Sequence, residues 1–414
     1  MGSPQKYFVF ILLGLLIFGC STDRSKERTI VIWHQMRPDE REILRILLTR
    51  FQSLHHDTLK VVEVYKETEE LRNGFVIASI AGQGPDLVYG PSDPVGIYEA
   101  TRTIRPLEDL FVPEEISLFD SSGILYYKGH LYMIADKIGN HLALVYNKKY
   151  VNAPPETDTG LVNLALDIQA KFGRTANRPN VYGIAWNYTE PFFYIPFFTG
   201  FGGWIFRDDG VTPNLNTPEM IAGLNYIRAL RDTYRIVPNE SDYEIADALF
   251  KDGKSAMIIN GDWSWAGYLN RGLDIGIAPL PLNTSTGLWA APMTSPKGYS
   301  MNVNVTPERE GMVVSLLKFL LNEENQLETA RALNTAPTLL SLYGHPDIVA
   351  NEILRNSLLQ IKRGKTMPVV PELRAIWDSM RPGYQAVMGG ALTPEQAAEQ
   401  MQRLAEKKIK DMRE

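Results

Sequence analysis

The sequence has a single cysteine among its 414 residues, so it cannot form an internal disulfide. It also lacks an HExxH pair, a GxSxG elbow and a P-loop, the motifs of zinc hydrolases, serine hydrolases and nucleotide-binding proteins. The adjacent histidines His55 and His56 do not replace a zinc motif, because helical zinc sites use residues four positions apart. We therefore expect a protein that is stabilised by its core alone and needs no cofactor and no metal.

The chain also has little net charge, because its positive and negative side chains nearly balance. The chain has 42 lysines and arginines against 48 aspartates and glutamates, a net charge of -6. Such a balance offers no basic surface for nucleic acid or for an anionic membrane. The composition, 44% hydrophobic and 22% charged, is that of a globular protein.

One strongly apolar run stands at the N-terminus, from Tyr7 to Phe18. It is shorter than the roughly 20 residues that a transmembrane helix needs, so we interpret residues 1–19 as a signal peptide. Residues 17–20, Ile-Phe-Gly-Cys, resemble the bacterial lipobox, with Phe18 where a small or aliphatic residue is usual. We expect an exported protein with a lipid on Cys20 and a polar tether over residues 20–28, facing the periplasm or the cell exterior. The alternative for Cys20 is a buried thiol.

From residue 29 onward, short β-branched runs alternate with amphipathic segments. The pattern predicts strands at 29–33, 60–65 and 86–89, with helices at 39–54 and 69–81 between them. It predicts further strands at 182–187, 255–260 and 273–278, and helices at 217–234 and from Thr393 onward. This alternation indicates parallel βαβ units, and the length indicates two α/β lobes.

The topology also indicates where a ligand would bind. In open α/β sheets the site lies beyond the carboxyl ends of the strands. The loops 34–37 and 90–93 follow two predicted strands, which places Arg37 and Asp93 beside the site.

Three short segments combine aromatic residues with carboxylates or guanidinium groups, at 187–194, 260–265 and 376–381. A sugar presents an apolar C–H face and a rim of hydroxyls, so flat aromatics beside charged groups suit a saccharide. The same aromatics would also suit a protein core. We expect core positions for Trp186, Phe193 and Trp265. We place Trp263 and Trp377 in the site, because each lies beside the turn that opens or closes a predicted helix.

Five segments resemble a known family in their order along the chain. They are residues 82–87, 146–148, 242–250, 256–263 and 367–372, the last followed by Trp377. Together they resemble the maltose/maltodextrin-binding branch of bacterial ABC-transporter solute-binding proteins. The resemblance implies an α/β, two-lobed periplasmic-binding-protein fold of type II, in which each lobe is a sandwich around a mainly parallel sheet and hinge segments join the lobes. It implies an N-terminal lobe of 29–138 plus about 287–336, and a C-terminal lobe of about 139–286 plus 337–414.

The resemblance also implies roles for individual residues. Trp263 and Trp377 would stack on sugar rings, Asp93 and Glu190 would bind hydroxyls, and Phe192 stands where the family usually has tyrosine. Arg381 would either bind the ligand or pair with a carboxylate. The full predicted ligand-binding set is Arg37, Asp93, Asn140, Glu190, Phe192, Trp263, Trp377 and Arg381.

The sequence departs from the family at three positions near this set. Gly90 stands in place of a tryptophan, Pro94 in place of an arginine and Asn140 in place of a glutamate. These departures remove a stacking face and two charged hydroxyl partners. They favour a saccharide other than maltose, or one that is placed differently in the site.

We therefore expect the saccharide-binding component of an ABC importer, which closes on its ligand at a hinge and delivers it to permease subunits. It would perform no reaction, exist as a monomer, and contact the membrane only through the lipid on Cys20. Two alternatives stay open. One is a glycoside hydrolase, which would need two carboxyl groups across the scissile bond. The other is a binding protein for a polyamine or a peptide. The positive guanidinium of Arg381 argues against a polyamine, because a polyamine is itself positively charged.

Overall fold

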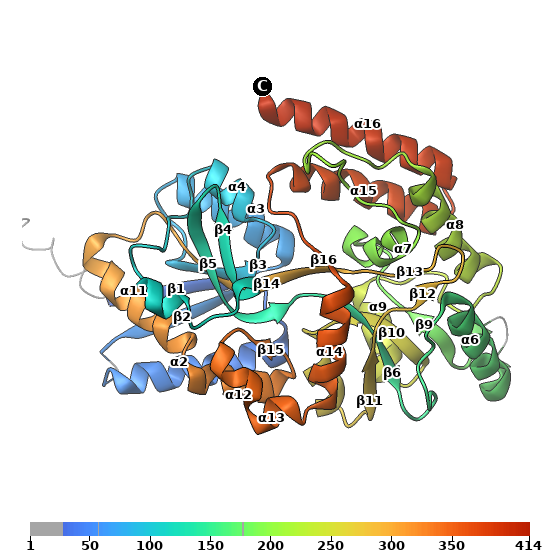
Figure 1. Cartoon of the computed structure of the whole chain (residues 1–414), viewed down its shortest axis with the longest axis horizontal. Coiled ribbons are helices and arrows are strands. Elements are labelled where there is room, and N and C mark those ends of the chain that lie inside the picture. The colour runs from blue at the N-terminus through green and yellow to red at the C-terminus, as the bar shows by residue number, and fades with distance from the viewer. Residues whose placement is uncertain (1–27, 57, 176–177) are drawn as a thin grey trace, which may run out of the picture.

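The structure is a computed structural model that describes residues 28–56, 58–175 and 178–414. The predicted signal peptide and the predicted lipid-attachment site, Cys20, lie outside the described residues. The chain forms two lobes that lie side by side, with the N-terminal lobe on the left of Figure 1 and the C-terminal lobe on the right. Within the described ranges, no helix combines the length and the apolar character needed to cross a membrane.

The N-terminal lobe is built on a sheet with strand order β15-β5-β14-β3-β1-β2, to which β4 is added beside β5 and β16 beside β14. Its strands are β1 (Thr29–His34), β2 (Lys60–Tyr65), β3 (Leu87–Pro91), β4 (Ile124–Tyr127), β5 (His130–Gly139), β14 (Met293–Met301), β15 (Ala336–Pro337) and β16 (Lys365–Thr366). The strand β1 pairs in parallel with both β2 and β3, which confirms the predicted βαβ units.

Helices cover both faces of this sheet (Figure 1). They are α2 (Pro38–Leu54), α3 (Thr68–Ile80), α4 (Val95–Ala100), α5 (Pro113–Ile116), α11 (Pro307–Leu320) and α12 (Glu323–Leu333), with a 3-10 turn η1 (Ser121–Gly123). Helix α2 begins with Pro38 at its first position, where a missing N–H costs nothing, and buries Leu44, Leu47 and Phe51 at helical spacing. The predicted helices 39–54 and 69–81 therefore agree with the structure to within one residue at each end.

The C-terminal lobe has a second sheet, with strand order β11-β6-β10-β9. Its strands are β6 (Leu142–Asn147), β9 (Tyr182–Ala185), β10 (Ser255–Gly261) and β11 (Ile275–Ala278), and two short strand pairs are formed by β7 (Arg174–Thr175) with β8 (Arg178–Pro179) and β12 (Leu282–Asn283) with β13 (Leu288–Trp289). Its helices and 3-10 turns are α6 (Asp158–Phe172), η2 (Pro191–Phe193), α7 (Ile195–Gly200), α8 (Pro218–Asp232), α9 (Tyr243–Lys251), α10 (Trp265–Asn270), α14 (Glu352–Arg363), α15 (Glu372–Met388) and α16 (Pro394–Arg413). Two further elements, η3 (Leu340–Gly344) and α13 (Pro346–Val349), pack against α12 of the N-terminal lobe. The predicted capping box at Thr393 is present at the start of α16.

The prediction of mainly parallel sheets was wrong, because both sheets are mixed. In the N-terminal lobe, β14 runs antiparallel to its neighbours β3 and β5. In the C-terminal lobe, β6 runs antiparallel to β10 and β11. The cause is the route of the chain. β5 leads out of the first lobe and β14 leads back into it, so β14 runs through the sheet in the direction opposite to β5.

Each lobe has its own hydrophobic core. The lobes are joined where β5 gives way to β6, at Gly139 and Asn140, whose φ angles of 131° and 38° both fall in the region that L side chains rarely adopt. A second crossing leads into β14. We propose the first two lobe boundaries that the sequence predicts, near residues 138 and 286. We propose the third after α13 rather than near residue 336, because Leu339 and Leu342 pack in the core of the N-terminal lobe.

A buried charge cluster holds the two crossing strands together. Lys137 of β5 and Lys297 of β14 face each other in register, and their ammonium groups lie 2.5 and 2.8 Å from the carboxylate of Glu40. Burial alone would raise the pKa of Glu40, but the two lysines outweigh it and hold this pKa well below its usual range. The first turn of α2 is thereby fixed to both strands.

At Gly298, β14 lies close against the backbone of β5. A Cβ atom at this position would lie 2.4 Å from the Cα of Ala135 and 2.4 Å from the carbonyl oxygen of Ile134. We predict that Gly298→Ala lowers the free energy of unfolding by about 1 to 3 kcal/mol, because backbone atoms cannot move aside as side chains can. Urea denaturation measures the change. The matched control is Gly311→Ala in α11, where a Cβ would meet nothing within 4 Å and should be neutral or stabilising.

The Glu40 cluster generates a second prediction. Glu40→Gln leaves two buried lysines without a carboxylate, so the free energy of unfolding should fall by about 3 to 5 kcal/mol at pH 7. Because the pKa of Glu40 is depressed in the folded state, this advantage of the wild type should shrink as the pH falls below about 4.5. The exposed Glu42→Gln on the same helix is the control, and an equal loss in both variants would contradict the role of the cluster.

Candidate functional site

A cavity of about 440 Å³ lies between the two lobes. Its volume is in the range of small-molecule sites. The N-terminal lobe contributes the loops after β1 and β3 and the first turns of α3, and the C-terminal lobe contributes η2, the start of α9, the turn before α10 and part of α15. Every residue of the predicted ligand-binding set lines this cavity: Arg37, Asp93, Asn140, Glu190, Phe192, Trp263, Trp377 and Arg381.

Three aromatic side chains form one wall of the cavity. The ring of Phe192 lies 6.2 Å from that of Trp263 and 6.5 Å from that of Trp377, between centroids. Trp263 is half-buried and donates its indole N–H to the hydroxyl of Tyr243, 3.1 Å away. These rings offer apolar faces of the kind that cover the C–H face of a sugar.

The backbone makes room for Trp263. A Cβ atom on Gly261 would lie 2.2 Å from the ring of Trp263, so only glycine allows the indole to fold back over the end of β10. Trp377 lies in the second turn of α15, next to the turn that opens this helix, and is 5% exposed.

The predicted burial of the three aromatic residues Trp186, Phe193 and Trp265 is confirmed. Trp186 and Trp265 are fully buried in the C-terminal lobe, as expected. Phe193 is also buried, but it lines the cavity as well, so it belongs to both core and site.

Asp93 is bound by a residue that the sequence analysis missed. Arg72 of α3 lies 2.5 Å from the carboxylate of Asp93, and both side chains line the cavity. Burial raises the pKa of Asp93, and the guanidinium of Arg72 opposes that rise. Arg72 thus brings to Asp93 the positive charge that the family resemblance places at position 94, where this chain has proline. The only sequence signal was its spacing of three residues from Glu69 on one helix face.

Glu69, also missed, connects the two lobes. It pairs with Arg374 and with Arg381 of α15, the latter at 3.2 Å, and with Arg72 of its own helix at 3.3 Å. Burial would raise the pKa of Glu69, but these guanidinium groups outweigh burial and lower it.

Arg381 pairs with carboxylates in this structure. Besides Glu69, it donates to both oxygens of Glu190, at 3.1 and 3.2 Å. This two-point pairing fixes Glu190 with one edge toward the cavity. Of the two roles that the sequence leaves open for Arg381, pairing with a carboxylate is therefore present in this structure.

Arg37 lines the cavity from the N-terminal lobe. It contacts the C-terminal lobe, since its guanidinium lies 4.0 Å from the ring centroid of Tyr243 and 3.4 Å from the carboxylate of Glu244. Burial raises the pKa of Tyr243 to about 12, so its hydroxyl stays protonated while its oxygen accepts the hydrogen bond from Trp263.

Asn140 lies at the hinge rather than on the outer rim. Its backbone N–H donates to Asp262 at 3.1 Å, and its side-chain amide donates to the hydroxyl of Ser295 at 3.1 Å. The amide therefore ties β5 to β14 at the floor of the cavity. In the described residues, no group of three or more His, Cys, Asp or Glu side chains is arranged to hold a metal ion.

Comparison with known proteins agrees with this geometry. The family model described as bacterial extracellular solute-binding protein matches residues 47–356. A maltose/maltodextrin-binding domain from Bdellovibrio bacteriovorus, solved bound to maltotriose, is 41% identical, with a TM-score of 0.89 over 92% of this chain and 100% of that one.

Two relatives are more distant. A maltotriose-binding protein of Pyrococcus abyssi is 26% identical over 87% of this chain and 77% of its own length. A galactooligosaccharide-binding protein of Bacillus subtilis is 25% identical over 93% of this chain and 90% of its own length. The chain therefore belongs to the bacterial extracellular solute-binding proteins, in their maltose/maltodextrin-binding branch.

Proposed function

We propose that this protein is the saccharide-binding component of an ABC importer, and that its ligand is a short α-glucan such as maltotriose. The observation that carries the proposal is the cavity between the lobes, in which an aromatic wall faces a rim of ion-paired carboxylates and guanidinium groups. This combination offers a face for sugar rings and fixed partners for hydroxyls.

Each lobe would supply part of the ligand contacts. Asp93 and Arg37 act from the first lobe, and Glu190, Trp263 and Trp377 act from the second. A ligand that touches both sets stabilises only the closed arrangement, so binding and closure are the same event. No chemical step is needed for this role.

The ligand class rests on the named relatives and on the geometry together. Two of them bind maltotriose by name, which favours an α-glucan. Gly90 stands where the family resemblance implies a tryptophan, so one stacking face of the N-terminal lobe is missing. We therefore propose that the sugar rings lie mainly against the C-terminal lobe, along Phe192, Trp263 and Trp377.

We propose that the captured sugar passes to the permease subunits of the importer, and that the protein acts as a monomer. Export and a lipid on Cys20 would keep the binding lobes close to those subunits. The anchor rests on the sequence of residues 17–20. Mass spectrometry of the mature N-terminus tests it directly.

Titration calorimetry with maltotriose and with a galactose-containing trisaccharide tests the function. We predict saturable binding of maltotriose, and we predict that Trp263→Ala weakens it by about tenfold or more, because an aromatic stacking face is lost. The thermal midpoint without ligand should change little, since Trp263 is only half-buried.

The matched control is Trp289→Ala, a half-buried tryptophan on β13 that does not line the cavity and should leave the affinity unchanged. Preference for the galactose-containing sugar would correct the ligand class. Steady release of glucose or maltose from maltotriose would contradict the binding function in favour of the glycoside hydrolase.

A further inference from the structure

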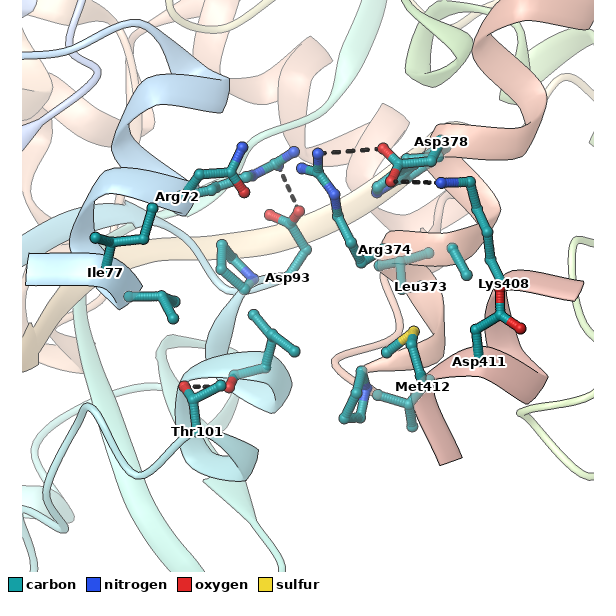
Figure 2. Close-up of a pocket in the computed structure, with 18 residues that line it drawn as sticks. Arg72, Ile77, Asp93, Thr101, Leu373, Arg374, Asp378, Lys408, Asp411 and Met412 are labelled. Carbon is teal, nitrogen blue, oxygen red and sulfur yellow. Dashed lines mark hydrogen bonds and ion pairs between the residues drawn. The ribbon is translucent and has the colours of Figure 1, made fainter. Parts of the chain in front are cut away.

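A second cavity of about 590 Å³ lies beside the saccharide cavity. It is bounded by α3 and α4 of the N-terminal lobe and by α15 and the end of α16 of the C-terminal lobe (Figure 2). The lobes approach closely here, since a Cβ atom on Gly96 of α4 would lie 1.7 Å from the carbonyl oxygen of Val369. Because its two sides come from different lobes, this cavity is complete only when the lobes are closed.

The two cavities share a boundary. Arg72, Asp93 and Trp377 line both of them. Glu69 lines the saccharide cavity and Arg374 lines the second one, and the ion pair between these two side chains stands on the border. The second cavity is therefore a continuation of the first, interrupted by one ion pair between the lobes.

A row of charged groups follows this border (Figure 2). Arg374 also pairs with Asp378 at 3.1 Å, and Lys408 lies 3.5 Å from the same carboxylate. These groups point along the upper edge of the cavity, where they are placed to meet the hydroxyls of a ligand that crosses the border.

Two polar atoms at the border have no partner among the described residues. They are Nε of Arg72, a donor, and Oδ1 of Asp93, an acceptor, and both are shielded from solvent. Asp93 as a whole is 8% exposed. Buried polar atoms are nearly always satisfied, so an unpartnered donor and acceptor on neighbouring side chains indicate a missing ligand group. A sugar hydroxyl fits, because it accepts and donates at once.

Beyond the border the walls are mainly aliphatic. The side chains that line this part are Val76, Ile77, Pro94, Ile97, Val370, Pro371, Leu373 and Met412, with Asn73 and Thr101 as polar members. An aliphatic wall below a row of charges can receive the C–H face of a sugar while its hydroxyls turn toward the row. It is a less specific surface than the aromatic wall of the first cavity.

We propose that the second cavity is an extension of the saccharide site, which receives the end units of an oligosaccharide longer than the first cavity can hold. The Glu69–Arg374 ion pair is the gate between the two parts. The inference rests on the proposed saccharide function and adds to it a chain-length range and a second set of contacts.

Opening this gate leaves no charge unpaired. When Glu69 and Arg374 separate, Glu69 keeps Arg72 and Arg381, and Arg374 keeps Asp378. A partly buried ion pair is costly to break when its members are left alone, and this arrangement avoids that cost. A short ligand leaves the gate closed, whereas a long one passes through it.

The test blocks the second cavity without touching the first. Asn73 is exposed, lies on α3 and lines only the second cavity, so Asn73→Trp places an indole there with no loss of buried contacts. Ile80→Trp, on the same helix at a position 68% exposed and outside both cavities, is the matched control. Titration calorimetry compares maltotriose, maltoheptaose and an alkyl maltoside for each protein.

We expect Asn73→Trp to weaken the binding of maltoheptaose by about fivefold or more, because only the longer chain reaches the blocked cavity. The affinity for maltotriose should stay within about twofold of the wild-type value. Ile80→Trp should change neither. An equal loss of affinity for both sugars, or no loss for either, would overturn the proposal. The proposed function would still stand in these cases, provided that the wild type binds maltotriose. Weakening of the alkyl maltoside alone would assign the cavity to apolar substituents and also overturn it. If the wild type binds no maltooligosaccharide, the proposed function itself fails.

Discussion

The contacts that Glu69 makes across the cleft determine how the two halves of the site meet. This side chain projects from the first lobe and is held by Arg374 and Arg381 of the second. Carboxylates at such half-buried positions lose solvation. Arg72 of the same helix offsets part of that loss, and Arg374 and Arg381 add to this compensation only while the lobes are together. The same contacts fix Glu190 through Arg381 and lie on the border of the two cavities, so one cluster of charges stands at the centre of the proposed site.

The structure of the hinge determines how the two lobes close. Lys137 and Lys297 lie on the two strands that lead between the lobes, and Glu40 binds both, so one carboxylate holds the two strands together. Asn140 then ties one strand to the other next to the positive-φ turn. Rotation concentrated at a short segment lets the two rigid cores close on a ligand without repacking. The saccharide supplies the differential contacts that favour the closed form.

Much of the fold could be predicted from the sequence because its signals are local. The strand 60–65 and the cap at Thr393 depend on spacing within a few residues, and the structure has them as predicted. The loops at the ends of β1 and β3 followed from topology, and the structure places Arg37 and Asp93 of these loops at the cavity.

What the sequence did not reveal depends on contacts between distant segments. The antiparallel course of β14 is decided by the return of the chain from the second lobe. Arg72 reaches Asp93 from a neighbouring helix, and its part in the site follows from the packing of α3 against the loop after β3. Glu69 and Arg374 are 305 positions apart, so their pairing appears only when the lobes are seen together. The family resemblance supplied the remaining site residues through their motifs.

The most direct test of the account is small-angle X-ray scattering of the soluble form, measured without sugar and with saturating maltotriose. The account predicts a smaller radius of gyration with sugar, because the ligand stabilises the closed arrangement in which Glu69 meets Arg374 and Arg381. An unchanged radius of gyration at a sugar concentration where calorimetry shows full binding would contradict it.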